Sequence, residues 1–141
     1  GAKVARDDDY LWFYVETAEK LTSKKNPHWM QLFIDVDRDK STGWNGYDYV
    51  VNYKPATGST AYVQASRLNK WLWQEAGKAH MKVAGNRLML AIPREVLNMA
   101  GKRLDFEFKW SDNMQDEGNI MDFYVNGDVA PGGRFNYVYT E

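Results

Sequence analysis

The fold class follows from Gln31-Leu-Phe-Ile-Asp-Val-Asp-Arg-Asp-Lys-Ser-Thr-Gly-Trp-Asn-Gly-Tyr-Asp-Tyr-Val-Val-Asn52, in which an acidic loop separates two apolar runs. Short runs of aliphatic and aromatic residues bounded by Asp, Ser and Gly are typical of β-strands. Gly43 and Gly46 mark the turn between the two runs, since glycine accepts backbone angles that other residues avoid. The segment therefore predicts a strand, a loop and a returning strand.

Three aspartates occupy alternate positions where the first of these strands ends, namely Asp35, Asp37 and Asp39. Residues two apart in an extended chain point to the same face, so we expect the three carboxylates to converge. Calcium binds roughly six to eight oxygen ligands, and a short acidic loop can supply several of them. The sequence thus predicts a structural calcium site at Asp35, Asp37 and Asp39, completed by the side-chain oxygen of Thr42 or Ser41 or by backbone carbonyls.

The acidic loop does not match the helix-loop-helix calcium motif. That motif needs glycine at the sixth position of the loop and glutamate at the twelfth, where this chain has Lys40 and Gly46. A solvated turn without metal is the alternative interpretation, because Asp, Ser and Gly all favour turns.

Size and composition exclude several classes of protein. The 141 residues are expected to form one domain, covering 1–141, and the leading glycine suggests a piece cut from a larger multidomain protein. A formal net charge of -1 without a basic stripe argues against a nucleic-acid partner. No apolar stretch approaches the roughly 20 residues of a membrane span. The absence of cysteine excludes disulfides and thiolate sites.

The rest of the chain repeats short strand-like segments separated by turn residues. Strands are expected at 10–17, 29–36, 60–66, 79–84, 87–92, 104–110, 120–125 and 134–139, and one short helix at 93–101, where proline begins and glycine ends the segment. Many short strands with hardly any helix predict an all-β, antiparallel β-sandwich of the jelly-roll type.

Aromatic residues make up 15% of the chain and supply candidate sugar contacts. A pyranose packs its C–H groups on an aromatic ring, while its hydroxyls bond to nearby amides, carboxylates and guanidinium groups. Trp71 and Trp73 would share one face of a strand beside Arg67, and Trp110 ends a strand next to Asn113. The alternative is that these tryptophans belong to the core.

Three segments of this sequence, 29–49, 109–113 and 122–137, resemble the β-sandwich domains related to carbohydrate-binding module family 9. Such domains are appended to secreted bacterial glycoside hydrolases, and the better-understood members hold a sugar between tryptophans and contain structural calcium. The resemblance implies a non-catalytic module that binds an oligo- or polysaccharide beside a catalytic domain of the same chain, in a secreted, periplasmic or cell-surface protein. It equally allows a structural accessory domain that packs on the catalytic domain and binds no sugar.

Catalysis is the third interpretation, and the sequence gives it little support. Glycosidases need one protonated and one ionised carboxyl group across the scissile bond. The carboxylates that lie close in sequence are Asp112, Asp116, Glu117 and Asp122, but nothing in the pattern makes one of them protonated and another ionised. We therefore expect a module without enzymatic activity.

Overall fold

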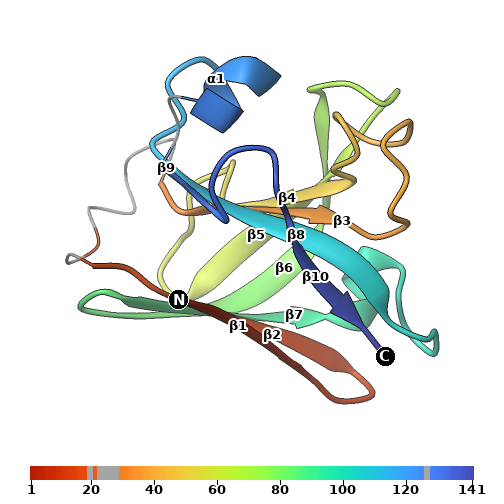
Figure 1. Cartoon of the computed structure of the whole chain (residues 1–141). Coiled ribbons are helices and arrows are strands. Elements are labelled where there is room, and N and C mark those ends of the chain that lie inside the picture. Colours follow the sequence, from red (N-terminus) through yellow and green to blue (C-terminus); the bar gives the residue numbers. More distant parts are fainter. Residues whose placement is uncertain (19–20, 22–28, 126–127) are drawn as a thin grey trace.

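The computed structural model describes residues 1–18, 21, 29–125 and 128–141, and it shows an all-β antiparallel sandwich (Figure 1). The predicted fold class is confirmed. Within the described residues the strands are β1 (Ala2–Arg6), β2 (Tyr10–Glu16), β3 (Gln31–Asp35), β4 (Tyr49–Val51), β5 (Thr60–Ser66), β6 (Trp73–Ala84), β7 (Arg87–Pro93), β8 (Asp105–Asp112), β9 (Asp128–Ala130) and β10 (Tyr137–Thr140).

All ten strands belong to one sheet, with the order β1-β2-β7-β6-β5-β4-β3-β8-β10 and with β9 paired to β8. The sheet folds over on itself, so that β1, β2 and β7 form one layer and β3 and β8 lie in the other (Figure 1). The long strand β6 pairs with both β5 and β7, and its register with β5 shifts between Val63 and Gln64. Such an irregularity increases twist and bending, which suits a strand at the fold of the sheet.

The core lies between the two layers and follows the alternation of the strands. In β2, Leu11, Phe13 and Val15 are buried, and the inward face of β8 is formed by Phe106, Phe108 and Trp110. Phe13 meets Phe106 and Phe108 edge-on across the sandwich, with ring centroids 6.0 and 5.2 Å apart. The quadrupoles of aromatic rings favour edge-on contacts, so these pairs have a preferred orientation in addition to the apolar area that they bury.

The predicted strand at 120–125 is wrong, because this segment forms the helix α1 (Ile120–Val125). Asn119 precedes the helix, and its Oδ1 accepts hydrogen bonds from the backbone N–H groups of Met121 and Asp122, at 3.0 and 3.2 Å. An asparagine in this position satisfies amides that the first turn of a helix leaves free. The cap therefore outweighs the strand-like composition of the segment.

The predicted helix at 93–101 is reduced to a single 3₁₀ turn, η1 (Arg94–Leu97). It ends at Asn98, whose left-handed backbone stops further helical hydrogen bonding. Strands β1 and β9 were not predicted from the sequence. None of the helices in the described part of the chain is long and apolar enough to cross a membrane.

Candidate functional site

The loop after β3 returns so that its last residue lies beside its first. Trp44 and Tyr47 bridge the loop through two backbone hydrogen bonds of 2.8 and 2.9 Å. Gly43 permits this turn, because it has a φ of +74° and a Cβ there would lie 2.3 Å from the carbonyl oxygen of Tyr47. The N–H of Asp48 then donates to the carbonyl of Ile34 at 2.8 Å, which places Asp48 beside the end of β3.

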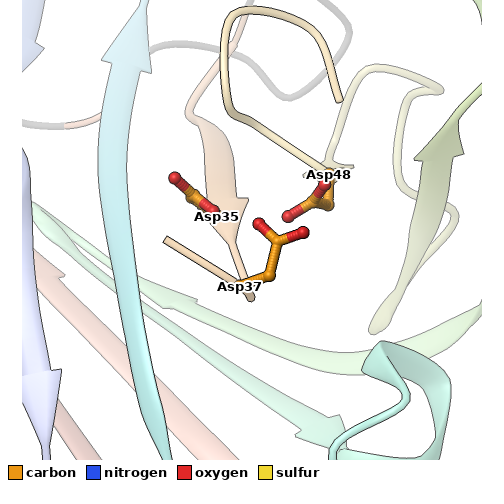
Figure 2. Close-up of side chains that lie close together, drawn as sticks. All are labelled: Asp35, Asp37 and Asp48. Atoms are coloured by element: carbon orange, nitrogen blue, oxygen red, sulfur yellow. The ribbon is translucent and has the colours of Figure 1, made fainter. Parts of the chain in front are cut away.

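Three carboxylates meet at this point, from Asp35, Asp37 and Asp48 (Figure 2). One oxygen of each lies within 4.8 Å of one oxygen of each of the others. Asp35 is fully buried, Asp48 is half-buried and Asp37 is exposed, so the group opens to solvent on one side. We call these three residues the acidic cluster.

Two of the four predicted calcium ligands lie in the acidic cluster, and two do not. Asp39 turns to its own loop, where its Oδ1 accepts hydrogen bonds from the N–H and the hydroxyl of Ser41, at 2.9 and 2.6 Å. Thr42 lies next to the cluster and donates its hydroxyl to Asp37 Oδ2 at 2.6 Å. Asp48, which sequence reasoning missed, occupies the third corner. The predicted hairpin could have indicated Asp48, because the residue just before the second strand of a hairpin lies beside the end of the first strand.

Burial dominates the electrostatics of the acidic cluster. Burial, with help from a hydrogen bond to Asp37, raises the pKa of Asp35 to about 6. Burial also raises the pKa of Asp48 to about 7, against the opposing effect of the hydrogen bond from the N–H of Val36. For Asp37, burial is outweighed by the hydrogen bond from Thr42 and by others, which keep its pKa below the usual value. When no cation is bound, the cluster therefore takes up protons as the pH falls below about 7.

One cation of the protein itself already touches the acidic cluster. Lys40 Nζ lies 3.3 Å from Asp35 Oδ2 and 3.5 Å from Glu107 Oε1. The other oxygen of Asp35, Oδ1, is buried and has no hydrogen-bond partner. A buried carboxylate oxygen without a partner is costly, so the lysine compensates only part of the negative charge.

Trp71 and Trp73 are not part of the acidic cluster and belong to a group of aromatic side chains on the outer side of β3. We call this group the aromatic cluster; it consists of Phe33, Trp44, Tyr47, Tyr53, Trp71, Trp73 and Phe123. The rings of Trp71 and Trp73 meet edge-on, with centroids 5.3 Å apart and an interplanar angle of 80°, and both residues are partly buried. Arg67 is exposed on the turn before β6. The two tryptophans therefore do not form the flat, parallel platform that a strand face would give.

Trp110 and Asn113 lie at a different place, near the end of β8 that pairs with β9. A pocket of about 570 Å³ opens there. Its described lining is Gly1, Val15, Glu16, Thr17, Ala18, Leu21, Met30, Trp110, Ser111, Asp112, Asn113, Asp128, Val129, Ala130 and Tyr137. Trp110 is 2% exposed and forms part of the wall. The five predicted sugar contacts are thus divided, with Arg67, Trp71 and Trp73 outside this pocket.

Two carboxylates in the lining of the pocket stand opposite each other. Asp112 of β8 is paired in register with Asp128 of β9, two residues from the pair of Trp110 and Ala130. Side chains two apart share a face, so Asp112 and Asp128 lie on the same face of the sheet as Trp110. Burial raises the pKa of Asp112, as does the nearby charge of Asp128, while the N–H of Met30 donates to Asp112 Oδ1 at 3.1 Å and opposes this.

The chain matches no known protein family, no curated protein and no solved structure. The resemblance to carbohydrate-binding module family 9 therefore stays a prediction, and the geometry of the pocket and of the acidic cluster carries the functional argument.

Proposed function

We propose that the protein is a non-catalytic carbohydrate-binding domain that takes a sugar unit into the pocket between Trp110, Asn113 and Asp128. The observation that carries this proposal is the composition of the pocket. Its volume of about 570 Å³ falls in the range of ligand sites, which are mostly apolar with a few polar groups that fix orientation. Here Met30 and Val15 supply apolar surface, while the carboxylates and the amide accept and donate hydrogen bonds as sugar hydroxyls require.

Calorimetric titration with a panel of mono- and oligosaccharides tests the proposal. Asn113→Gly is the informative variant, because residue 113 has a φ of +59° and glycine keeps that backbone while removing the amide. We expect Asn113→Gly to weaken binding about tenfold, and the Trp71→Phe protein, altered in the aromatic cluster, to bind as the parent does. No heat with any sugar would contradict the proposal. Loss of binding in Trp71→Phe alone would move the site to the aromatic cluster.

The same proposal includes the absence of catalysis. A glycosidase would need a proton donor and an ionised carboxylate placed on the two sides of a scissile bond. Asp112 and Asp128 instead stand side by side in paired strands, on one face of the sheet. Incubation with polysaccharides that bind should release no reducing sugar, and release that Asp112→Asn abolishes would contradict the proposal.

We also propose that the acidic cluster holds a calcium ion with a structural role. The donor set fits, because one carboxylate oxygen of each residue lies within 4.8 Å of one oxygen of each of the others, a spacing that one ion can span. Asp35 Oδ1 is also buried without a hydrogen-bond partner. Bound calcium would fasten the end of β3 to the start of β4. Because an ion that binds only the folded state stabilises it, calcium should raise the melting temperature over that in chelator.

Two matched variants separate this calcium site from the one expected from the sequence. Asp48→Asn should abolish the calcium-dependent rise in melting temperature, and Asp39→Asn should leave most of it, since Asp39 bonds only within its own turn. An equal response in both variants, or no response to calcium in the parent protein, would reject the site.

A second candidate function is a structural accessory domain that packs on a neighbouring catalytic domain. The observation in its favour is a group of exposed apolar side chains beside α1, where Val125 is 68% and Phe135 77% exposed. Arg134, which precedes Phe135, contacts α1, since its guanidinium lies 5.8 Å from the ring of Tyr124. Either function suits a secreted, periplasmic or cell-surface protein. Preparing the domain with and without its natural neighbours and comparing protection of α1 from hydrogen exchange would test this candidate.

A further inference from the structure

The charged side chains that the described residues bring to the pocket are all acidic. Asp112 and Asp128 stand directly opposite each other in the β8–β9 register, an arrangement that destabilises a sheet when both are ionised. Among the described lining residues there is no lysine, arginine or histidine, and the cation there is the terminal ammonium of Gly1, which donates to the backbone carbonyl of Glu16 at 3.0 Å. Glu16 is also part of the lining, but its carboxylate accepts a hydrogen bond from Tyr14 at 3.0 Å and pairs with Arg87 at 3.6 Å.

The carboxylates of Asp112 and Asp128 differ in their exposure to solvent. Asp112 is half-buried, and its carboxylate accepts a hydrogen bond from the backbone N–H of Met30. Asp128 is exposed at the start of β9, a strand of only three residues. A cation placed between them would relieve their repulsion, and it would enter a site that is partly shielded from water, where charge-assisted hydrogen bonds are strengthened.

A bound metal ion explains these observations less well than an organic cation does. In the described part of the chain, the residues that bring three acidic groups within reach of one ion are Asp35, Asp37 and Asp48, and neither pocket carboxylate is among them. The pocket is also large, and its wall is apolar at Trp110 and Met30. A space of about 570 Å³ suits a ligand with a carbon skeleton.

We propose that the pocket prefers a sugar unit that carries a protonated amine, a hexosamine, over neutral and anionic sugars. Its ammonium group lies between Asp112 and Asp128, and its ring packs against the apolar wall. This inference rests on the proposed function, and it names the class of carbohydrate: a polysaccharide with free amino groups.

Four monosaccharides of similar shape test the preference by calorimetry at about pH 6, where a sugar amine keeps its proton. They are glucosamine, glucose, N-acetylglucosamine and glucuronate. Glucosamine should bind about fivefold or more tighter than glucose, N-acetylglucosamine should show no such gain, and glucuronate should bind most weakly. Equal affinities for glucosamine and glucose would overturn the inference and leave the proposed function intact. No heat with any of the four, or with their oligomers, would instead reject the proposed function.

Variants and a non-sugar amine complete the test. Asp128→Asn should bring the glucosamine-to-glucose ratio close to one by weakening glucosamine more than glucose, and Asp8→Asn, at the far end of the β1–β2 hairpin, should keep the full preference. A preference that survives in Asp128→Asn and in Asp112→Asn would overturn the inference. So would cyclohexylamine binding as tightly as glucosamine, because the site would then recognise an amine and not a sugar.

Discussion

Asp48 is a carboxylate that folding makes harder to ionise. It accepts a hydrogen bond from the N–H of Val36 at 2.9 Å, yet burial raises its pKa from 3.8 to about 7. Asp35 beside it is affected in the same direction, with a pKa of about 6. The acidic cluster therefore lowers the stability of the fold at neutral pH whenever no cation is bound.

The pH dependence of stability follows from these shifts. Between about pH 4 and pH 7 the folded state binds more protons than the unfolded state, so the contribution of these groups is fully present below pH 4 and is lost as the pH rises through 6 and 7. In chelator, we expect the free energy of unfolding to fall by about 1–3 kcal/mol from pH 5 to pH 8. Urea unfolding at a series of pH values measures this.

Asp48→Asn gives the control for that measurement. An amide does not titrate, so this variant should show a flatter pH profile and a higher stability than the parent at pH 8. A profile as steep as the parent's would mean that other groups cause the dependence.

At the scale of elements, a buried lysine fixes the loop between β9 and β10. Lys109 of β8 is fully buried, and its Nζ donates to the carbonyls of Pro131 and Phe135 at 2.5 and 2.6 Å. Burial lowers its pKa to about 8. Both the ammonium and the neutral amine have enough N–H groups for two carbonyls, so the loop keeps these hydrogen bonds in either state.

Lys109→Met should destabilise the protein by about 2 kcal/mol, because both carbonyls lose their donor while the aliphatic volume is kept. Lys82→Met, on the exposed side of β6, should change stability by less than about 0.5 kcal/mol. Chemical unfolding compares the two variants, and equal effects would show that the two hydrogen bonds contribute little.

The helix α1 depends on its cap. Asn119→Ala removes the acceptor for the N–H groups of Met121 and Asp122 and should cost about 1 kcal/mol. Asn119→Ser supplies another capping oxygen and should recover most of that loss. Amide exchange in the first turn of α1 reports the change, and unchanged exchange in Asn119→Ala would argue against the cap.

At the scale of the whole molecule, close packing connects segments that are distant in the chain. Gly77 of β6 lies under η1, where a Cβ would approach the two methyl groups of Val96 to 2.7 and 2.8 Å. Across the sandwich, Arg6 at the end of β1 pairs with Glu141 after β10 at 3.2 Å, so the two edges of the sheet come together. The glycine contact contributes more to stability than the ion pair, because the ion pair is partly exposed to solvent.

Gly77→Ala should destabilise the fold by about 1–3 kcal/mol through overpacking against η1. The double variant Gly77→Ala/Val96→Ala should be less destabilised than the sum of the single variants, because the smaller side chain makes room for the new methyl group. Thermal unfolding of all four proteins measures the coupling, and strict additivity would contradict the contact.

The amino-acid sequence alone determined the class of fold, because alternation at every second residue is a local property. It was sufficient for β2, β5 and the inward face of β8, where apolar residues repeat along a single strand. It also indicated Asp35 and Asp37, since β3 is still extended or has only just ended there. The same rule failed for Asp39, because the chain leaves the extended conformation at Arg38, whose φ is +51°.

Only the tertiary structure decided which distant residues share a site. Asp48 reached the acidic cluster through the pairing of β3 with β4, and Asp128 came to lie opposite Asp112 through a strand of three residues that no pattern indicated. Trp71 and Trp110 were both predicted from the sequence as sugar contacts, but in the structure Trp110 packs in the main core and Trp71 in the aromatic cluster. The physical reason is that side-chain period is set within each strand, whereas the neighbours of a strand are set by how the whole sheet folds over its core.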